Sequence, residues 1–329
     1  MTNVLIINTQ PEDIRRQYYD HLREKFPQLT VNIVDHHSKV APYVASADVV
    51  MTFGPMMADH VLREGPNIKW IHCFTTGTDG VDDLPSLRPD ILITSSHGIH
   101  GDTVSEHALM LMLALSRHLH DHVRAQDQHR WATDPAHLLH GKTVGIFGMG
   151  AIGEGMASRC KAMGMIVHAI DPVRRRVAGV DKWHPWTDAE TIIPELDYVV
   201  LLMALTPRTR GLFEAKLLGK LKPTAYLINV GRGGLCDEWA LIDILRNGRI
   251  AGAGLDVFVE EPLPPDSPFW DLKNAIVTPH NAGPFDEYPK YCFPILDENM
   301  RRFLIGDTKN MINLVEHQLK REAKQFEHA

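Results

Sequence analysis

The sequence lacks the features of several protein classes. Its four cysteines, Cys73, Cys160, Cys236 and Cys292, lie far apart and form no CxxC pair, so neither a zinc site nor a disulfide framework is indicated. No uninterrupted apolar run exceeds the eight residues of 108–115, whereas a membrane-spanning helix needs about 20. Lysine and arginine together number 34 against 41 acidic residues, and the net charge of −7 leaves no basic surplus for nucleic acid or an anionic membrane.

A secretory signal is also missing. Residues 1–8 have no basic start, long apolar core or small-residue cleavage site, so we expect a cytoplasmic protein. Histidine is abundant, with 19 residues, but in the histidine-rich stretch 118–140 only His118 and His122 share a helix face, and a suitably spaced third ligand is missing. We therefore predict no metal site. The 44% apolar and 23% charged residues are typical of a globular protein, and 329 residues suffice for two domains.

Short β-branched apolar segments alternate with helical patterns from the first residues onward. Strands are expected over 4–7, 31–34, 49–51, 68–73 and 91–94, with a helix over 11–26. This alternation indicates βαβ units and a parallel sheet. The first hundred residues are therefore predicted to form one small α/β domain.

A second α/β series begins near residue 141, after a helix expected over 104–119. Strands are predicted over 143–147, 165–170, 198–202, 225–229, 252–256 and 275–278, with helices over 151–163 and 239–247 between them. Six strands with intervening helices make a doubly wound sheet. The stretch 297–315 is predicted to be helical, without strands of its own, and to pack back on the first domain.

A glycine-rich turn, GMGAIG over 148–153, follows the first strand of this second series and opens a helix. Gly148 permits the tight turn, Gly150 lets the backbone approach a pyrophosphate, and Gly153 lets the helix pack close to the strand. The pyrophosphate would then lie on the free N–H groups at the helix N-terminus. The pattern favours a dinucleotide site, while a methyltransferase, which can carry a similar turn, stays open as an alternative.

The strand predicted over 165–170 ends in Asp171, 18 residues after Gly153. Its carboxylate would accept hydrogen bonds from the adenosine ribose, and its charge would repel a 2′-phosphate. This favours NAD over NADP. Against it stand the three arginines of 174–176, which could reach a 2′-phosphate, so the strictness of the preference stays open.

Three further residues follow predicted strands at the edge where an open α/β sheet binds its ligand, and we expect Arg232, Glu261 and His280 to converge there. Reduction of a 2-oxo acid requires a proton at the carbonyl oxygen, which His280 can deliver as a general acid. A neighbouring Glu261 would favour the imidazolium and raise the pKa of His280. Arg232 can hold the substrate carboxylate with its planar fork, and Asp256 is placed to meet the nicotinamide.

The segments around these residues resemble one family closely. They are VSEHA at 104–108, GKTVGI at 141–146, the turn at 148–153, LTPRTR at 205–210, NVGRGG at 229–234, DVFVEEP at 256–262 and TPH at 278–280. In type, order and spacing, over residues 70 to 305, they are similar to the D-isomer-specific 2-hydroxyacid dehydrogenases. Two departures are Ala204, where members usually carry proline, and the loop TTGTDG at 75–80, which leaves the identity of the substrate open.

The resemblance implies the catalytic roles of Arg232, Glu261 and His280 and a substrate site that includes Arg232 and His280. It also implies that the loop 75–80 binds the substrate carboxylate through backbone N–H groups. The substrate residues expected in that loop are Thr76, Gly77 and Thr78. The residues expected to bind the cofactor, NAD, are Gly148, Gly150, Ala151, Ile152, Gly153, Asp171, Thr206, Val230, Gly231, Asp256, His280 and Gly283.

The resemblance further implies an α/β fold of two doubly wound parallel-sheet domains. A Rossmann NAD domain over 101–284 would be inserted into a flavodoxin-like substrate domain made of 1–100 and 285–329. Family members are usually dimers joined through the cofactor domain, so we expect a homodimer. In some glyoxylate reductases a tryptophan near the place of Trp131 enters the neighbouring subunit's pocket.

The function expected from the sequence is hydride transfer between NADH and C2 of a 2-oxo acid, with His280 as general acid and base. The substrate is therefore a small 2-oxo or 2-hydroxy acid whose side chain the sequence does not identify. An alternative from another class is an NAD-sensing scaffold, because C-terminal-binding corepressors share this pattern and retain the three catalytic residues. Rapid NADH oxidation with a 2-oxo acid would exclude the scaffold.

Overall fold

The computed structural model describes residues 2–315, and its chain divides into two compact units. The discontinuous unit combines the chain up to Ile99 with the chain from Phe285 onward, and the central unit comprises His100–Pro284. Residues 316–329, which the sequence assigns to the substrate domain, lie outside the described residues. Within residues 2–315, every helix is too short or too polar to cross a membrane.

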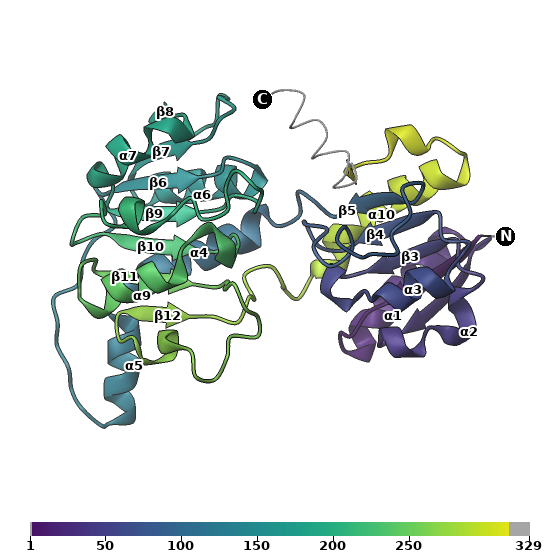
Figure 1. Ribbon diagram of the computed structural model, residues 1–329, viewed down its shortest axis with the longest axis horizontal. Helices are drawn as coiled ribbons and strands as arrows, with labels where there is room; N and C mark the ends of the chain where they lie inside the picture. The colour runs from purple at the N-terminus through teal and green to yellow at the C-terminus, as the bar shows by residue number, and fades with distance from the viewer. Residues whose placement is uncertain (1, 316–329) are drawn as a thin grey trace. The chain divides into compact units, whose positions relative to one another are not determined.

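The discontinuous unit is built on a six-stranded sheet with the order β13-β5-β4-β3-β1-β2 (Figure 1). Its strands are β1 (Asn3–Ile7), β2 (Thr30–Val34), β3 (Val49–Thr52), β4 (Trp70–Cys73), β5 (Leu92–Ser95) and β13 (Leu314–Val315). Its helices are α1 (Glu12–Lys25), α2 (Ala41–Val44), α3 (Asp59–Glu64) and α10 (Tyr288–Leu304), with short 3-10 turns η1 (His37–Lys39), η2 (Gly54–Met56) and η7 (Thr308–Asn310). The first five strands are parallel, as predicted.

The two faces of this sheet have different helices. Val4 and Ile6 of β1 pack in one core with residues of α1 and α10, such as Leu296. Leu5 and Ile7 point to the other face and share a core with residues of α2 and α3. Because both faces are covered, the strand is apolar at nearly every position, as buried parallel strands are.

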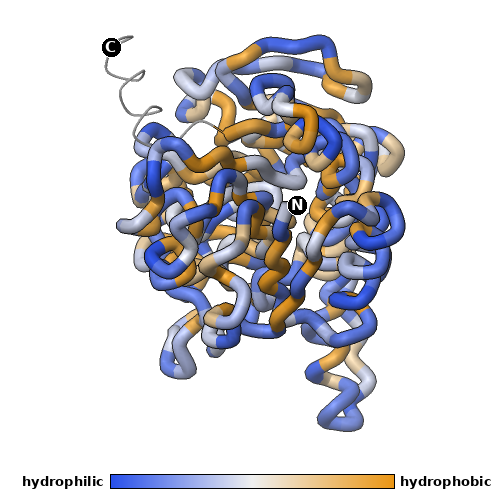
Figure 2. Tube along the Cα trace, turned by 90° about the vertical axis from the view of Figure 1, so that its right-hand side faces the viewer, coloured by the Kyte–Doolittle hydropathy of each residue, from blue (hydrophilic) through white to orange (hydrophobic). Residues whose placement is uncertain are grey.

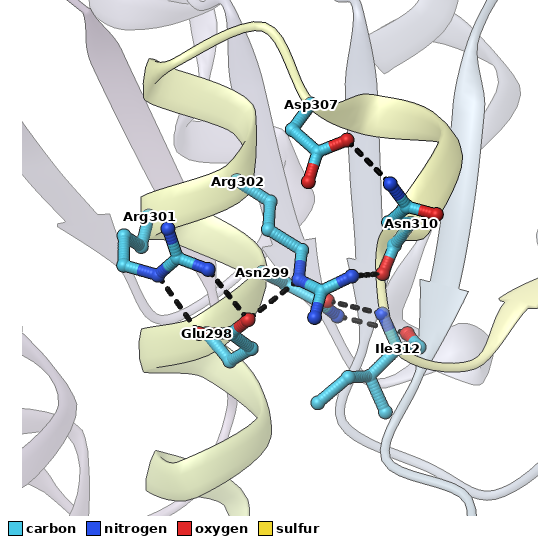
Figure 3. Close-up of polar contacts among 7 residues, drawn as sticks. All are labelled: Glu298, Asn299, Arg301, Arg302, Asp307, Asn310 and Ile312. Carbon is cyan, nitrogen blue, oxygen red and sulfur yellow. Dashed lines mark hydrogen bonds and ion pairs between the residues drawn. The ribbon is translucent and has the colours of Figure 1, made fainter.

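The C-terminal stretch differs from the prediction. A helix without strands was expected over 297–315, but α10 begins earlier, at Tyr288, and ends at Leu304, and β13 then pairs antiparallel with β5. The chain leaves the helix at Gly306, whose φ of +78° favours glycine. Buried Asn299 then holds the returning chain, because its side-chain amide donates to the carbonyl oxygen of Ile312 (3.0 Å) and accepts from the N–H of Ile312 (2.6 Å) (Figure 3).

The central unit is built on a seven-stranded parallel sheet with the order β12-β11-β10-β9-β6-β7-β8 (Figure 1). Its strands are β6 (Thr143–Phe147), β7 (Ile166–Ile170), β8 (Lys182–His184), β9 (Tyr198–Leu201), β10 (Tyr226–Asn229), β11 (Gly252–Leu255) and β12 (Ala275–Val277). Its helices are α4 (Gly101–Ser116), α5 (Leu119–Asp127), α6 (Ala151–Ala162), α7 (Ala189–Ile192), α8 (Ala215–Leu218) and α9 (Glu238–Arg246), with 3-10 turns η3 (Trp186–Asp188), η4 (Ile193–Glu195), η5 (Gly233–Leu235) and η6 (Pro268–Asp271). This confirms the predicted doubly wound α/β fold.

Two details of the central unit correct the sequence prediction. The sheet has a seventh strand, β8, which was missed because its three residues, two of them Lys182 and His184, carry no apolar alternation. The single helix expected over 104–119 is two helices, α4 and α5, because His118 between them has a φ of +54° that interrupts the helical path. Figure 1 shows α5 and the chain after it extending away from the sheet.

Helices cover both faces of the central sheet. One core contains Ala108 and Leu111 of α4 together with Met156 of α6. The other contains Leu217 of α8 and Leu241 of α9. Figure 2 shows hydrophobic residues concentrated in the interior and hydrophilic residues on many of the outer turns.

Candidate active site

The predicted cofactor residues come after the C-terminal ends of strands in the central unit. The chain passes from β6 outward to β8 and then returns to β9 on the other side of β6, so the strand order reverses between β6 and β9. Open α/β sheets bind ligands at such a switch point. The turn at 148–153 follows β6, and Thr206 lies in the loop after β9, where its N–H donates to Thr209 Oγ1 (2.8 Å).

The glycine turn has the geometry that its sequence predicts. Gly148 has a φ of +100°, and a Cβ on Gly153 would lie 2.3 Å from the carbonyl oxygen of Gly148, so both positions require glycine. Gly150 faces open space, where a Cβ would meet nothing within 4 Å. Ala151 and Ile152 begin α6, and the first N–H groups of a helix have no partner within it. The turn therefore fits a pyrophosphate.

Asp171 follows β7 and holds the turn in place. One carboxylate oxygen accepts from the N–H of Met149 (2.9 Å) and the other from the N–H of Val173 (2.9 Å). Each oxygen keeps a further lone pair for a ribose hydroxyl. The arginines of 174–176 line an adjacent pocket of about 340 Å³ with Trp183, and Arg175 also donates to the carbonyl oxygen of Met149.

Val230, Gly231 and Arg232 come directly after β10. The side chain of Asn229, the last residue of that strand, braces them: its amide nitrogen donates to the carbonyl oxygen of Arg232 (3.1 Å), and its amide oxygen accepts from the N–H of Gly231 (3.2 Å). The Arg232 guanidinium donates to the carbonyl oxygen of Gly231 (2.8 Å). Its positive charge acts to lower the pKa of both Glu261 and His280.

Glu261 and His280 form a direct pair, with His280 Nδ1 and Glu261 Oε2 separated by 2.6 Å. The hydrogen bond to Glu261 raises the pKa of His280 above its usual value, although burial acts in the opposite direction. Burial acts to raise the pKa of Glu261, but the hydrogen bonds from His280 and from the N–H of Phe258 together lower it. The pair therefore favours an imidazolium beside a carboxylate, as the sequence suggested.

Asp256, at the end of β11, is fully buried and holds the loop that carries His280. Its carboxylate accepts from the Thr278 hydroxyl (2.5 Å) and from the N–H groups of Asn281 and Ala282 (both 3.0 Å). Its carbonyl oxygen accepts from the N–H of His280 (2.8 Å). These contacts stabilise a left-handed backbone at His280, with a φ of +50°. Contact of Asp256 with a nicotinamide stays a prediction.

His107 of α4 was not among the predicted site residues, although it lies in the VSEHA segment at 104–108. It contacts the loop that carries His280. Its Nε2 is 3.0 Å from Thr278 Oγ1. Because the Thr278 hydroxyl donates to Asp256, His107 must donate to that hydroxyl through Nε2. Burial lowers the pKa of His107, and the nearby Asp256 opposes that effect only in part. Gly283, the last predicted cofactor residue, ends the same loop beside the ring of His100.

The predicted substrate loop lies in the discontinuous unit, after β4. Its backbone folds back on itself: the hydroxyl of Thr75 donates to the carbonyl oxygen of Gly77 (2.7 Å), and that of Thr78 to Asp82 (2.6 Å). Gly80 closes the loop with a φ of +81°. Thr76 lies in this loop, and its part in binding a substrate, with Gly77 and Thr78, stays a prediction.

Within residues 2–315, no group of three or more histidine, cysteine, aspartate or glutamate side chains is arranged to hold a metal ion.

Comparison with known proteins agrees with this geometry. The family described as "D-isomer specific 2-hydroxyacid dehydrogenase, NAD binding domain" matches residues 109–282. The chain belongs to this family. It is 36% identical to a glycerate dehydrogenase of Methylorubrum extorquens over 269 residues, which cover 78% of this chain and 82% of that protein.

Solved structures of the family have the same fold. A D-isomer specific 2-hydroxyacid dehydrogenase family protein from Aeromonas salmonicida superposes with a TM-score of 0.87 at 29% identity, covering 96% of this chain and 99% of that one. An NADPH-dependent glyoxylate/hydroxypyruvate reductase from Sinorhizobium meliloti, in complex with NADP and sulfate, gives 0.83 at 27% identity, covering 96% and 99%. The family and enzyme class predicted from the sequence are thus confirmed: this 2-hydroxyacid dehydrogenase is an NAD(P)-dependent oxidoreductase.

Proposed function

We propose that this dehydrogenase reduces the C2 carbonyl of a small 2-oxo acid to the D-2-hydroxy acid, and catalyses the reverse oxidation, with His280 as general acid and base. The observation that carries the proposal is the 2.6 Å contact between His280 and Glu261 at the C-terminal edge of the central sheet. The bound dinucleotide supplies or accepts the hydride. The residues of the chain bind and orient the acid and move the proton.

His280 has a free nitrogen for this task. Its Nδ1 is occupied by Glu261, while 47% of the side chain is exposed, which leaves Nε2 to face a substrate. In reduction, the imidazolium donates the Nε2 proton to the carbonyl oxygen as negative charge develops there. In oxidation, the neutral ring accepts the hydroxyl proton, and Glu261 stabilises the resulting imidazolium.

Arg232 is proposed to hold the substrate carboxylate and to polarise the carbonyl group. A guanidinium donates two parallel hydrogen bonds to a carboxylate, which fixes the orientation of the acid. Its backbone is rigid because Asn229 holds the carbonyl oxygen and Gly233 packs against Phe258. The backbone N–H groups of Thr76, Gly77 and Thr78 are proposed as further substrate-binding groups.

The proposed cofactor is NAD. Gly148, Gly150 and the N-terminus of α6 would hold its pyrophosphate, Asp171 the adenosine ribose, and Thr206, Val230, Gly231, Asp256 and Gly283 its nicotinamide half. One observation favours NADP instead: the arginines of 174–176 line a pocket beside Asp171. Comparing kcat/KM for NADH and NADPH decides between them, and equal values would refute the preference for NAD.

A homodimer joined through the central unit is proposed as the assembly. Trp131 is 94% exposed, and Leu119 and Val123 of α5 are about half exposed, so this projecting segment carries apolar side chains that a second copy would cover. Sedimentation of the protein should show a dimer, and W131A should weaken it. A monomer at micromolar concentration would exclude the proposal.

The function is tested by following NADH absorbance with glyoxylate, hydroxypyruvate, pyruvate and phenylpyruvate. Turnover with at least one acid is expected, and the acid with the highest kcat/KM identifies the side chain that the site accepts. NADH binding without turnover on any of the four would favour the scaffold alternative instead.

A further inference from the structure

The loop that carries Glu261 is held by a second carboxylate, that of Glu238. A carboxylate oxygen of Glu238 accepts a 2.7 Å hydrogen bond from the backbone N–H of Val259. Glu261 accepts a 2.8 Å hydrogen bond from the preceding N–H, that of Phe258. Two successive N–H groups therefore donate to two different carboxylates, one within the loop and one from the first residue of α9.

The same peptide group is packed against the segment that carries Arg232. A Cβ on Gly233 would lie 2.0 Å from the carbonyl carbon of Phe258 and 2.4 Å from the nitrogen of Val259, so this position admits only glycine. The chain then passes through η5 to Glu238 at the start of α9. Gly233 thus packs against the peptide group between Phe258 and Val259, and Glu238 accepts a hydrogen bond from the N–H of the same group.

The position of Glu238 is electrostatically unfavourable. Burial raises its pKa, the hydrogen bond from Val259 opposes that effect, and the neighbouring Glu261 raises the pKa further. Arg232 and His280, the other charged groups around Glu261, lower the pKa of Glu261 itself. A carboxylate at the start of a helix is usually explained by the helix dipole alone. A partly buried carboxylate next to another one, with a specific backbone partner, requires a further explanation.

We propose that Glu238 is a positioning residue for the catalytic pair. By accepting from the N–H of Val259, it fixes the loop so that the Glu261 carboxylate stays in contact with Nδ1 of His280. Glu238 acts through Glu261 and does not take part in proton transfer itself. The proposal rests on the function proposed above for Glu261 and His280.

The test compares E238Q with E238A. Glutamine keeps an oxygen that accepts from Val259, whereas alanine removes the acceptor and leaves the loop without this anchor. E260Q is the matched control, because Glu260 is an exposed acid of the same loop. The pKa of His280 is measured by NMR titration in each protein, with H280A identifying the signal and E261Q marking the value without the carboxylate.

E238A is expected to shift the pKa of His280 at least halfway towards its value in E261Q, while E238Q and E260Q shift it little. With the best 2-oxo acid, kcat should fall about 10- to 100-fold in E238A and less than about threefold in E238Q, with the KM for the cofactor unchanged. If E238Q keeps the kcat and the His280 pKa that E238A loses, the hydrogen bond to Val259 is the cause of the defect in E238A.

Two results would overturn the proposal. A lower melting temperature in E238A with unchanged His280 pKa and kcat would make Glu238 a purely structural residue. An equal effect in E238Q and E238A would assign the effect to charge rather than to the hydrogen bond. If the parent protein reduces no 2-oxo acid, the proposed function fails, but the comparison of His280 pKa values still decides the role of Glu238.

Discussion

At the scale of single residues, His280 and Glu261 each shift the pKa of the other, and under the proposed function this coupling would set the pH range of the chemistry. As the proposed general acid and base, His280 would have to be protonated for reduction and neutral for oxidation. A raised pKa therefore extends reduction to higher pH. In this proposal, the carboxylate of Glu261 sets that limit through its hydrogen bond to His280.

Replacing Glu261 with glutamine should lower the pKa of His280, because the largest effect that raises it is lost. Reduction should then lose activity at a lower pH than in the parent, and oxidation should persist to a lower pH. The measurement is kcat/KM against pH in both directions. Unchanged profiles in E261Q would show that Glu261 is an ordinary loop acid.

The same pair predicts how stability depends on pH. The raised pKa of His280 contributes stability below its ordinary value of 6.5, and this contribution is lost as pH rises through the higher folded value. The lowered pKa of Glu261 contributes above its ordinary value of 4.5 and is lost as pH falls. The difference in melting temperature between parent and E261Q should therefore be largest near about pH 5.5. A difference independent of pH would contradict the ion pair.

Asp171 holds the glycine turn and is proposed to bind the adenosine ribose, and one substitution should test both roles. D171A should narrow the preference for NADH over NADPH, because the charge that opposes a 2′-phosphate is lost beside three arginines. It should also lower the free energy of unfolding by about 1–3 kcal/mol, because the N–H groups of Met149 and Val173 lose their acceptor. Kinetics with both cofactors and urea unfolding measure the two effects. An unchanged cofactor ratio would remove Asp171 from the ribose site.

The sequence predicted the residues whose position follows from topology. Arg232, Glu261 and His280 come after parallel strands, and the carboxyl ends of such strands share one edge. His107 and Glu238 could not be predicted in the same way. Both lie on helices, where a polar side chain is expected at any exposed position, and their partners are far away in the sequence.

At the scale of elements, the apolar strands of both sheets were predicted, whereas two short strands at sheet edges, β13 and β8, were not. The strands β1 and β9 are apolar on both faces because helices cover both faces. At the edges, β13 has two residues, and β8 has three that are all partly or fully exposed. These two strands form because a neighbouring strand offers hydrogen-bond partners, and their own sequences carry no alternation of apolar and polar residues that could predict them.

The buried side-chain amide of Asn299 is one of the groups that hold the chain on its return to β13, and N299A removes it. The N–H and the carbonyl oxygen of Ile312 would both lose their partner, so we expect a loss of about 1–3 kcal/mol in the free energy of unfolding. N310A is the control, because the Asn310 side chain makes an exposed contact with Asp307 in the same region (Figure 3). Equal effects of both substitutions in urea unfolding would contradict a special role for Asn299.

At the scale of the whole molecule, each unit has its own cores on both sides of its own sheet. The predicted cofactor residues all lie in the central unit, and the substrate loop lies in the discontinuous one. Cofactor binding can therefore be examined separately from substrate turnover.

H280A should reduce turnover by about 10²- to 10⁴-fold, as expected for loss of a general acid. Stabilisation by the cofactor should persist, because His280 is proposed to transfer a proton rather than to hold the adenosine half. NADH at 100 times its Kd should stabilise parent and variant alike, by about 2.7 kcal/mol. Thermal unfolding with and without NADH measures this effect. Loss of the stabilisation in H280A would instead make His280 a major cofactor contact.

The division of one unit into two chain segments has a consequence during synthesis on the ribosome. The central unit is continuous and can complete its fold as soon as it has emerged. The discontinuous unit has to wait for α10, because its core joins Tyr18 and Leu22 of α1 to Leu296 and Met300 of that helix. Until then, one apolar face of its nascent sheet lacks one of the two helices that cover it. Slow translation of the central unit would therefore prolong the time in which this face can bind a chaperone or aggregate.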